Sequence, residues 1–275
     1  MMITSAIIVS TAGLIFRTLD NIDAFEIVFF RGLALIFSML CTIPILYQNE
    51  AVKTIKSVGL AGMLGATFFT GAQIFYIFAF SNTTVANTTF TIAIAPFLTA
   101  LLAWVVLKEL ISRLTVIAMS VAAIGITFII AGDLSAEGKL GIFFAFMTAC
   151  CFSCFAVTLR RNKHIEMLPV LLLTGIFSSL IGLLMSEWHV MPSIKDVVLC
   201  FVWGGLLQGV GQSLLVLSSK ALKAAEVPFI MLLEFTLGPV WVWVIYSEQI
   251  SYAAIIGGTL IFASIFGLAF TETGK

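Results

Sequence analysis

The sequence predicts an all-α integral membrane protein with ten transmembrane helices, arranged as two inverted five-helix repeats. Three observations lead to this fold class: the scarcity of charge, a series of apolar runs, and the distribution of lysine and arginine between them. Of the 275 residues, 61% are hydrophobic and only 10% are charged. A water-soluble domain carries about 25% charged residues, so we expect lipid to surround much of this chain.

The apolar runs have the length that a membrane-spanning helix needs. A hydrocarbon core of about 30 Å takes roughly 20 residues at 1.5 Å each. Ten runs approach that length, at residues 2–18, 24–47, 58–80, 85–107, 114–132, 140–159, 168–185, 197–217, 224–246 and 252–270. The first run has neither a basic leading segment nor a clear cleavage signal, so we expect it to span the membrane and not to be a signal peptide.

Positive charge is unevenly divided between the two sides that this topology creates. The segments after the second, fourth, sixth and eighth runs and the C-terminus hold ten lysines and arginines: Lys53, Lys56, Lys108, Arg113, Arg160, Arg161, Lys163, Lys220, Lys223 and Lys275. The opposite segments hold three, Arg17, Lys139 and Lys195. Because positively charged loops stay in the cytoplasm, both termini are predicted to be cytoplasmic, which agrees with an even number of spans.

An internal repeat appears when the chain is shifted by 139 residues, which sets residues 81–112 beside residues 220–251. Eight of these 32 positions are identical, among them Trp104 with Trp243 and Glu109 with Glu248. We therefore predict two repeats, residues 1–133 and residues 134–275. Each holds an odd number of spans, so the second enters the membrane from the opposite face, as in many alternating-access transporters.

Two stretches of the chain resemble a known family. Residues 85–132 contain PFLTALLAWVVLKE, in which Glu109 follows Pro96 by thirteen residues, and residues 224–267 are the later copy of this stretch. Arg31, early in the second run within FFRGLAL, also matches the family pattern. In these features the chain resembles the drug/metabolite transporter superfamily with its EamA-type repeat.

The resemblance implies a multi-pass carrier of the bacterial inner membrane that exports amino acids, other metabolites or drugs. It also implies a small-molecule substrate and no cofactor. One departure from the family pattern concerns the ninth run, where Phe235 replaces a proline, so a helix kink would move to Pro239 or weaken.

Two ionisable residues near the middle of the membrane are the leading candidates for a substrate-binding site. Charged side chains at this depth cost about 2.5–3.5 kcal/mol on insertion scales, and they usually face a cavity or a partner. Glu234 lies about 15 Å from the cytoplasmic end of its run, and Arg31 about 10 Å below the outer face. The two are expected to form either an ion pair or a split site that binds a charged or zwitterionic solute, with protons as a candidate coupling ion, or a buried pair that only fixes helix packing.

Polar and aromatic residues at similar depths complete the candidate site: Gln208, Gln212, Gln73, Tyr76 and Trp203. Amides and phenols can hydrogen-bond a polar solute, but they also join neighbouring helices. Glu109 and Glu248 are instead expected to stabilise helix ends, because a carboxylate just before a helix start complements the helix dipole.

Other function classes fit the sequence poorly. An intramembrane enzyme needs a cluster of histidines, carboxylates or a nucleophile with its base, whereas the two histidines, His164 and His189, fall in loops on opposite sides. A formal net charge of zero offers nothing to nucleic acid, and no cysteine and histidine pattern indicates a metal site. We therefore expect a transporter, with a passive channel or facilitator as the alternative.

Overall fold

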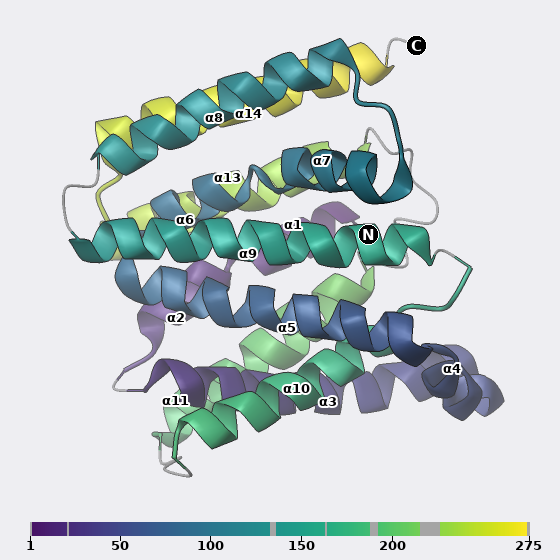
Figure 1. Ribbon diagram of the computed structural model, residues 1–275. Coiled ribbons are helices and arrows are strands. Elements are labelled where there is room, and N and C mark those ends of the chain that lie inside the picture. Colours follow the sequence, from purple (N-terminus) through teal and green to yellow (C-terminus); the bar gives the residue numbers. More distant parts are fainter. Residues whose placement is uncertain are drawn as a thin grey trace.

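The computed structural model describes residues 2–20, 22–132, 136–162, 164–187, 192–214 and 226–273. These residues are almost entirely helical and contain no strand (Figure 1). Up to Gly132 the elements are α1 (Met2–Ser10), α2 (Ala12–Thr18), α3 (Ala24–Tyr47), η1 (Gln48–Glu50), α4 (Ala51–Ser57), α5 (Gly59–Asn82), α6 (Val85–Ile92), α7 (Ala95–Leu107) and α8 (Arg113–Gly132). After it they are α9 (Ala136–Arg161), α10 (Pro169–Met185), α11 (Ile194–Phe201), η2 (Val202–Val210), α13 (Glu226–Tyr246) and α14 (Tyr252–Thr273).

Helices suited to a membrane recur along the described chain. Six are long and apolar enough to cross a bilayer: Ala24–Tyr47, Gly59–Asn82, Val85–Leu107, Arg113–Gly132, Ala136–Arg161 and Ile194–Leu214. Shorter apolar helices cover Ala6–Thr18, Pro169–Met185 and Tyr252–Leu268. The all-α, multi-pass character is thus confirmed. The count of ten spans and the side of each terminus stay predictions, and the boundary proposed between the repeats lies outside the described residues.

Two of the predicted runs are divided in the structure. The first breaks at Thr11, between α1 and α2, and the fourth breaks between α6 and α7. Pro96 stands in the first turn of α7, where a proline has no N–H to donate and its ring would clash with a carbonyl four residues earlier. At Pro96 the helix is therefore interrupted. By contrast, α13 continues through Pro239 without a break in helical assignment.

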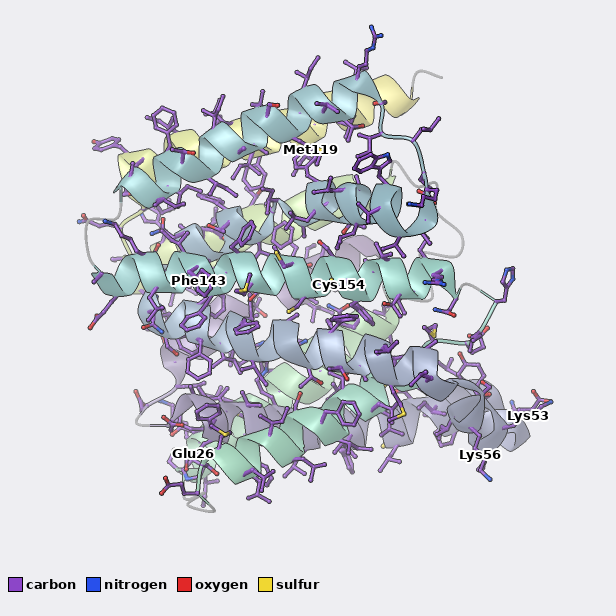
Figure 2. The ribbon with its side chains drawn as sticks, viewed as in Figure 1. Glu26, Lys53, Lys56, Met119, Phe143 and Cys154 are labelled. Carbon is purple, nitrogen blue, oxygen red and sulfur yellow. The ribbon has the colours of Figure 1, made fainter. Side chains whose placement is uncertain are left out.

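The ends of the bundle are marked by charge. At one end Asp23 caps α3, because its carboxylate accepts from the Phe25 N–H at 2.9 Å while Glu26 accepts from the Asp23 N–H at 3.0 Å. At the other end the short helix α4, which the hydrophobic pattern did not predict, carries Lys53 and Lys56 away from the bundle (Figure 2). Asp23 and Glu26 thus lie at one end of the bundle, and Lys53 and Lys56 at the other.

Helix packing brings the two parts of the chain together. The helix α5 packs along α9, α3 along α10, and α8 along α14, so each of these pairs joins an early helix to a late one (Figure 1). The helix α3 also packs on η2, while α13 packs on α1 and α2. The helices α3, α5, α9, η2 and α13 thereby surround a space in the middle of the bundle, where the candidate residues lie.

Candidate functional site

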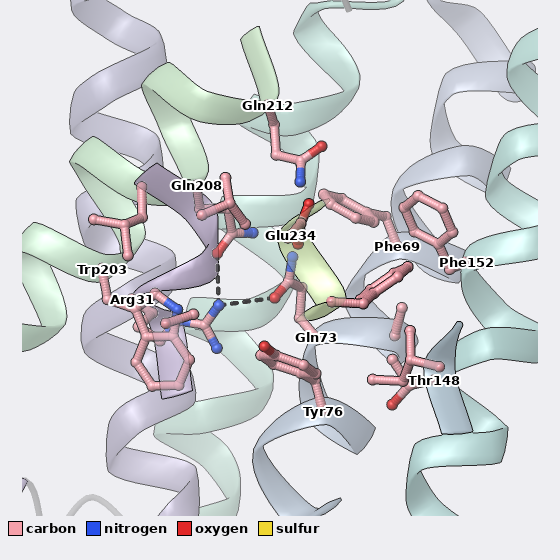
Figure 3. Close-up of a pocket in the computed structure, with 16 residues that line it drawn as sticks. Arg31, Phe69, Gln73, Tyr76, Thr148, Phe152, Trp203, Gln208, Gln212 and Glu234 are labelled. Atoms are coloured by element: carbon pink, nitrogen blue, oxygen red, sulfur yellow. Dashed lines mark hydrogen bonds between the residues drawn. The ribbon is translucent and has the colours of Figure 1, made fainter. Parts of the chain in front are cut away.

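A single cavity of about 100 Å³ is bordered by all seven residues that the sequence singled out: Arg31, Gln73, Tyr76, Trp203, Gln208, Gln212 and Glu234 (Figure 3). They come from four helical segments, α3, α5, the span that contains η2, and α13. A water molecule needs only about 10–15 Å³ of such space. The cavity is therefore large enough for a small solute, and the structure brings the whole predicted set together.

Arg31 of α3 is the most constrained residue of the site. Its side chain is 5% exposed, and its Nη2 donates to Oε1 of Gln73 at 2.9 Å and to Oε1 of Gln208 at 2.8 Å. Its Cζ atom lies 3.8 Å from the centre of the Trp203 ring. Charge-assisted hydrogen bonds and a cation–π contact hold the guanidinium in one orientation.

Part of the donor capacity of Arg31 is unused. Both Nε and Nη1 are buried, and neither has a hydrogen-bond partner among the described residues. An unsatisfied buried donor costs about 1–3 kcal/mol, and more when it is charged. A fixed, buried cation with spare donors beside a cavity is suited to an anionic group of a bound solute.

A stretch of π-helix explains how Trp203 and Gln208 reach the same arginine. The element η2 has π-helical hydrogen bonding, in which each N–H reaches back five residues, so residues five apart lie on one face. In an α-helix the same spacing separates two side chains by roughly 140° around the axis. The sequence analysis named Trp203 and Gln208 as candidates but did not predict this relation between them, although π-helical turns frequently mark functional sites.

Glu234 of α13 borders the same cavity, but it does not form the expected pair with Arg31. Among the described residues, no ion pair involves either side chain. In Figure 3 the amides of Gln73 and Gln208 are bonded to Arg31, and Glu234 stands further along the same cavity. Because both glutamine oxygens accept from Arg31, their Nε2 groups remain as donors on the cavity side of the cluster.

The remaining wall of the cavity is mainly apolar and was not predicted. Phe69 of α5 and Phe152 of α9 lie with their ring centres 6.3 Å apart, and Ile92, Phe235 and Thr148 also border the space. A sequence signal existed for part of this wall, because Phe69, Gln73 and Tyr76 follow the i, i+4, i+7 pattern of one helix face. Residues from different helices could not be joined in this way without the packing.

Of the two glutamates expected to stabilise helix ends, Glu248 does so at a helix distant in sequence, and both also form ion pairs. Glu248 accepts from the N–H of Val85, the first residue of α6, at 2.7 Å, and therefore stabilises a helix other than the one that follows it. It also pairs with Arg17, while Glu109 pairs with Arg160. Both carboxylates thus join separate helices.

Comparison with known proteins supports the resemblance seen in the sequence. Residues 1–131 match the EamA-like transporter family, so the resemblance to EamA-type drug/metabolite transporters is confirmed there. A solved structure titled only "Crystal structure of protein" is similar to the chain at a TM-score of 0.70 and 15% identity, over 96% of this chain and 93% of the other. That likeness concerns the fold alone. No curated protein matches the chain.

Proposed function

We propose that this chain, whose first 131 residues match a family of membrane transporters of small solutes, is a secondary transporter for a small zwitterionic metabolite. It would export an amino acid or a similar solute across the inner membrane by alternating access, with the cavity as its binding site. Export and the inner membrane follow from the resemblance. The chemistry of the cavity supports the substrate class.

The observation that carries this proposal is the separation of Arg31 and Glu234 within one cavity. A buried pair that only fixed helix packing would bring the two charges into contact, since an isolated buried charge is costly. Instead Arg31 donates hydrogen bonds to two neutral amides, and its Nε and Nη1 have no partner among the described residues. Two opposite charges held apart by neutral hydrogen-bonding groups match a solute that itself carries separated charges.

The walls of the cavity favour a solute with an apolar part. Arg31 and the glutamine amides offer donors to a carboxylate, and Glu234 offers a partner to an ammonium group. On the other side Phe69 and Phe152 provide aromatic surface without charge. An amino acid with an apolar side chain would satisfy all three regions, whereas a fully polar sugar would leave the aromatic wall without a complementary surface.

Glu234 also supports coupling to protons. A carboxylate at this depth is tolerated when a proton or a cation neutralises it. If the ammonium group of the solute and a proton compete for the same carboxylate, binding one releases the other, and the two are exchanged across the membrane. A proton gradient directed inward would then drive export.

The proposed alternating access rests on the predicted inverted repeats. Helix packing supports the repeats, because the contact of α3 with η2, the second and eighth runs, has a counterpart in that of α10 with α5, the seventh and third runs. The contact of α13 with α1 and α2 is likewise matched by that of α9 with α6 and α7. Two halves with interchangeable contacts can open the same cavity to either side in turn.

Counterflow in reconstituted vesicles tests the proposal. Vesicles loaded with a panel of unlabelled amino acids should take up the labelled form of the substrate transiently above equilibrium, with saturation. Arg31→Gln should abolish this uptake, and Glu234→Gln should strongly reduce it. A passive channel, the alternative function, would equilibrate the solute without saturation or counterflow, and that result would replace the transporter proposal.

A further inference from the structure

An ion pair closes one end of the bundle above the cavity. Nε of Arg17, in the last turn of α2, donates to Oε2 of Glu248 at 2.8 Å, and Nη2 donates to the carbonyl of Thr83 at 3.0 Å. Oε1 of Glu248 accepts from the N–H of Val85 at 2.7 Å. Four chain segments, α2, the end of α5, the start of α6 and the residues after α13, are thus joined by one pair of charges.

A second ion pair lies at the other end, and its glutamate is the repeat counterpart of Glu248, although the offset of 139 residues pairs Arg17 with Ala156 and not with Arg160. Nη2 of Arg160, in the last turn of α9, lies 3.0 Å from Oε2 of Glu109, which follows α7. The offset of 139 residues that defines the repeat pairs Glu109 with Glu248. It also makes α9, the sixth run, the counterpart of α1 and α2, the first run. Both pairs therefore join equivalent helices of opposite halves.

An aromatic column connects the first ion pair to the cavity. The Cζ atom of Arg17 lies 5.7 Å from the centre of the Phe16 ring, and Phe16 lies 5.4 Å from Phe80 and 6.2 Å from Trp203 between ring centres. Tyr76 continues the column, with its ring centre 4.4 Å from that of Phe80. Because Trp203 and Tyr76 border the cavity, a solute that moves them would disturb the packing beneath Arg17.

We infer that the two ion pairs are the alternating gates of the transporter, made and broken in turn at opposite ends of the cavity. Arg17 with Glu248 forms the gate at the end that the topology places outside, and Arg160 with Glu109 forms the gate at the cytoplasmic end. The four residues are positioning residues that set which side can reach the cavity. This inference rests on alternating access as proposed above.

Both ion pairs are formed in this structure, but they differ in burial. The side chains of Arg17 and Glu248 are 28% and 19% exposed, whereas those of Arg160 and Glu109 are 56% and 42% exposed. The second pair also lacks the backbone hydrogen bonds that accompany the first within the described residues. Because both pairs are formed, the structure corresponds to a state closed at both ends, and the exposed pair contributes less to closure than the partly buried one.

Accessibility of the cavity to a thiol reagent tests the inference without relying on transport. Ala12 borders the cavity below Arg17 and is 3% exposed, so Ala12→Cys places a small reporter there. The five native cysteines would be replaced by alanine, and counterflow of this background checks that it is intact. A membrane-impermeant maleimide is then applied from each side, without substrate, to chains carrying Glu248→Gln, Arg17→Gln, Arg17→Lys or Glu109→Gln.

Opposite shifts at the two ends are the expected result. Glu248→Gln keeps an oxygen for the Val85 N–H but removes the charge, and should raise labelling from the Arg17 side by about tenfold or more, as loss of a charged hydrogen bond implies. Arg17→Gln should raise labelling from the Arg17 side to a similar extent, and Arg17→Lys should raise it less. Glu109→Gln should lower labelling from the Arg17 side by less than about fivefold, because its pair is exposed.

Two outcomes would overturn the inference. Labelling that stays unchanged from the Arg17 side in Glu248→Gln, or labelling that rises equally from both sides, would assign the pair to helix packing alone. If Arg17→Gln fails to accumulate, the isosteric Glu248→Gln still gives the measurement. Absence of counterflow in the wild type would refute the proposed function, yet the labelling would still report whether the two pairs control access.

Discussion

The guanidinium of Arg31 lies over the Trp203 ring, with its Cζ atom 3.8 Å from the ring centre, and both side chains are buried. While the guanidinium lies over the ring, its Nη2 donates to the amide oxygens of Gln73 and Gln208. Lysine has the same charge but neither the flat face nor the fork of donors. The site therefore depends on arginine in particular and not on positive charge in general.

Arg31→Lys should lower the rate of counterflow by about 10-fold to 100-fold, which corresponds to roughly 1.5–3 kcal/mol for hydrogen bonds to a charged group. Arg31→Gln, which also removes the charge, should leave no measurable uptake. The measurement is initial uptake in reconstituted vesicles, normalised to the amount of protein inserted. Arg161→Lys, at an exposed arginine at the end of α9, is the matched control and should behave as wild type. If Arg31→Lys keeps the wild-type rate, neither the contact with the Trp203 ring nor the arrangement of guanidinium donors is needed for transport.

The π-helical turn of η2 should be essential for the site. Insertion of an alanine after Gly205 would set Trp203 and Gln208 six residues apart, and neither α-helical nor π-helical bonding places that spacing on one face. We expect transport to be lost although the protein still accumulates in the membrane. The control is Gly205→Ala, since a Cβ there would meet the carbonyl oxygen of Ala34 at an ordinary 3.5 Å. Equal loss in both variants would indicate a packing defect in place of a change in register.

The sequence predicted which residues border the cavity better than it predicted the details of the helices that carry them. Arg31 and Glu234 could be found because ionisable groups deep in apolar runs are rare and costly. Gln208 and Gln73 could be found in a similar way, because an amide deep in an apolar run is also costly, although less so than a charge. In contrast, Arg31 and Glu234 are separate because the side-chain oxygens of the glutamines accept from Arg31. The depth of a residue along its helix does not predict such contacts.

Other features depended on contacts between distant segments. The aromatic wall of Phe69 and Phe152 consists of residues that are ordinary in any apolar helix, so nothing distinguished them before packing placed them together. The pair of Arg17 with Glu248 joins residues 231 positions apart. The break at Pro96 could be expected from the missing N–H of proline, but the π-helical turn could not, because glycine-rich apolar sequence is compatible with an α-helix as well.

Close packing of α8 on α14 makes a prediction about stability. A Cβ at Gly125 would lie 2.6 Å from the carbonyl oxygen of Gly257 and 2.9 Å from Cγ1 of Ile261. Gly125→Ala should therefore destabilise the protein by about 1–3 kcal/mol, as overpacking does, and lower the midpoint of thermal unfolding in detergent. Gly267→Ala on α14 is the control, because nothing lies within 4 Å of its Cβ. A Gly125→Ala protein as stable as the control would mean that the two helices separate easily.

The topology predicts the result of reporter fusions. The predicted cytoplasmic side holds ten lysines and arginines, and the opposite side holds three. This distribution predicts that the segment after Arg160 and the C-terminus lie in the cytoplasm and that the segment with Lys139 lies outside. A fusion after Arg160 should therefore give cytoplasmic activity, and a fusion after Lys139 the opposite. An external signal after Arg160 would contradict the ten-helix arrangement, because one missed span reverses every later segment.

Glu234 should determine how transport depends on pH. If a proton and the solute alternate on its carboxylate, a pH gradient directed into the cell should accelerate export by the wild type. Glu234→Gln has a similar shape but cannot bind or release a proton. We therefore expect this variant to give no response to an imposed gradient, with any residual uptake independent of pH. The measurement is uptake into vesicles of inverted orientation, with and without an acid interior.

Two further variants separate proton coupling from recognition of charge. Glu50→Gln, at a carboxylate whose side chain is 71% exposed, should keep the wild-type response, which controls for loss of any single acidic group. Glu234→Asp keeps the charge but shortens the side chain, so the response to the gradient should persist while affinity for the solute falls. If Glu234→Gln instead keeps a full response to the gradient and loses only affinity, the carboxylate recognises the ammonium group of the solute and the proton is bound elsewhere. Wild-type rates and wild-type pH dependence in Glu234→Gln would exclude both roles.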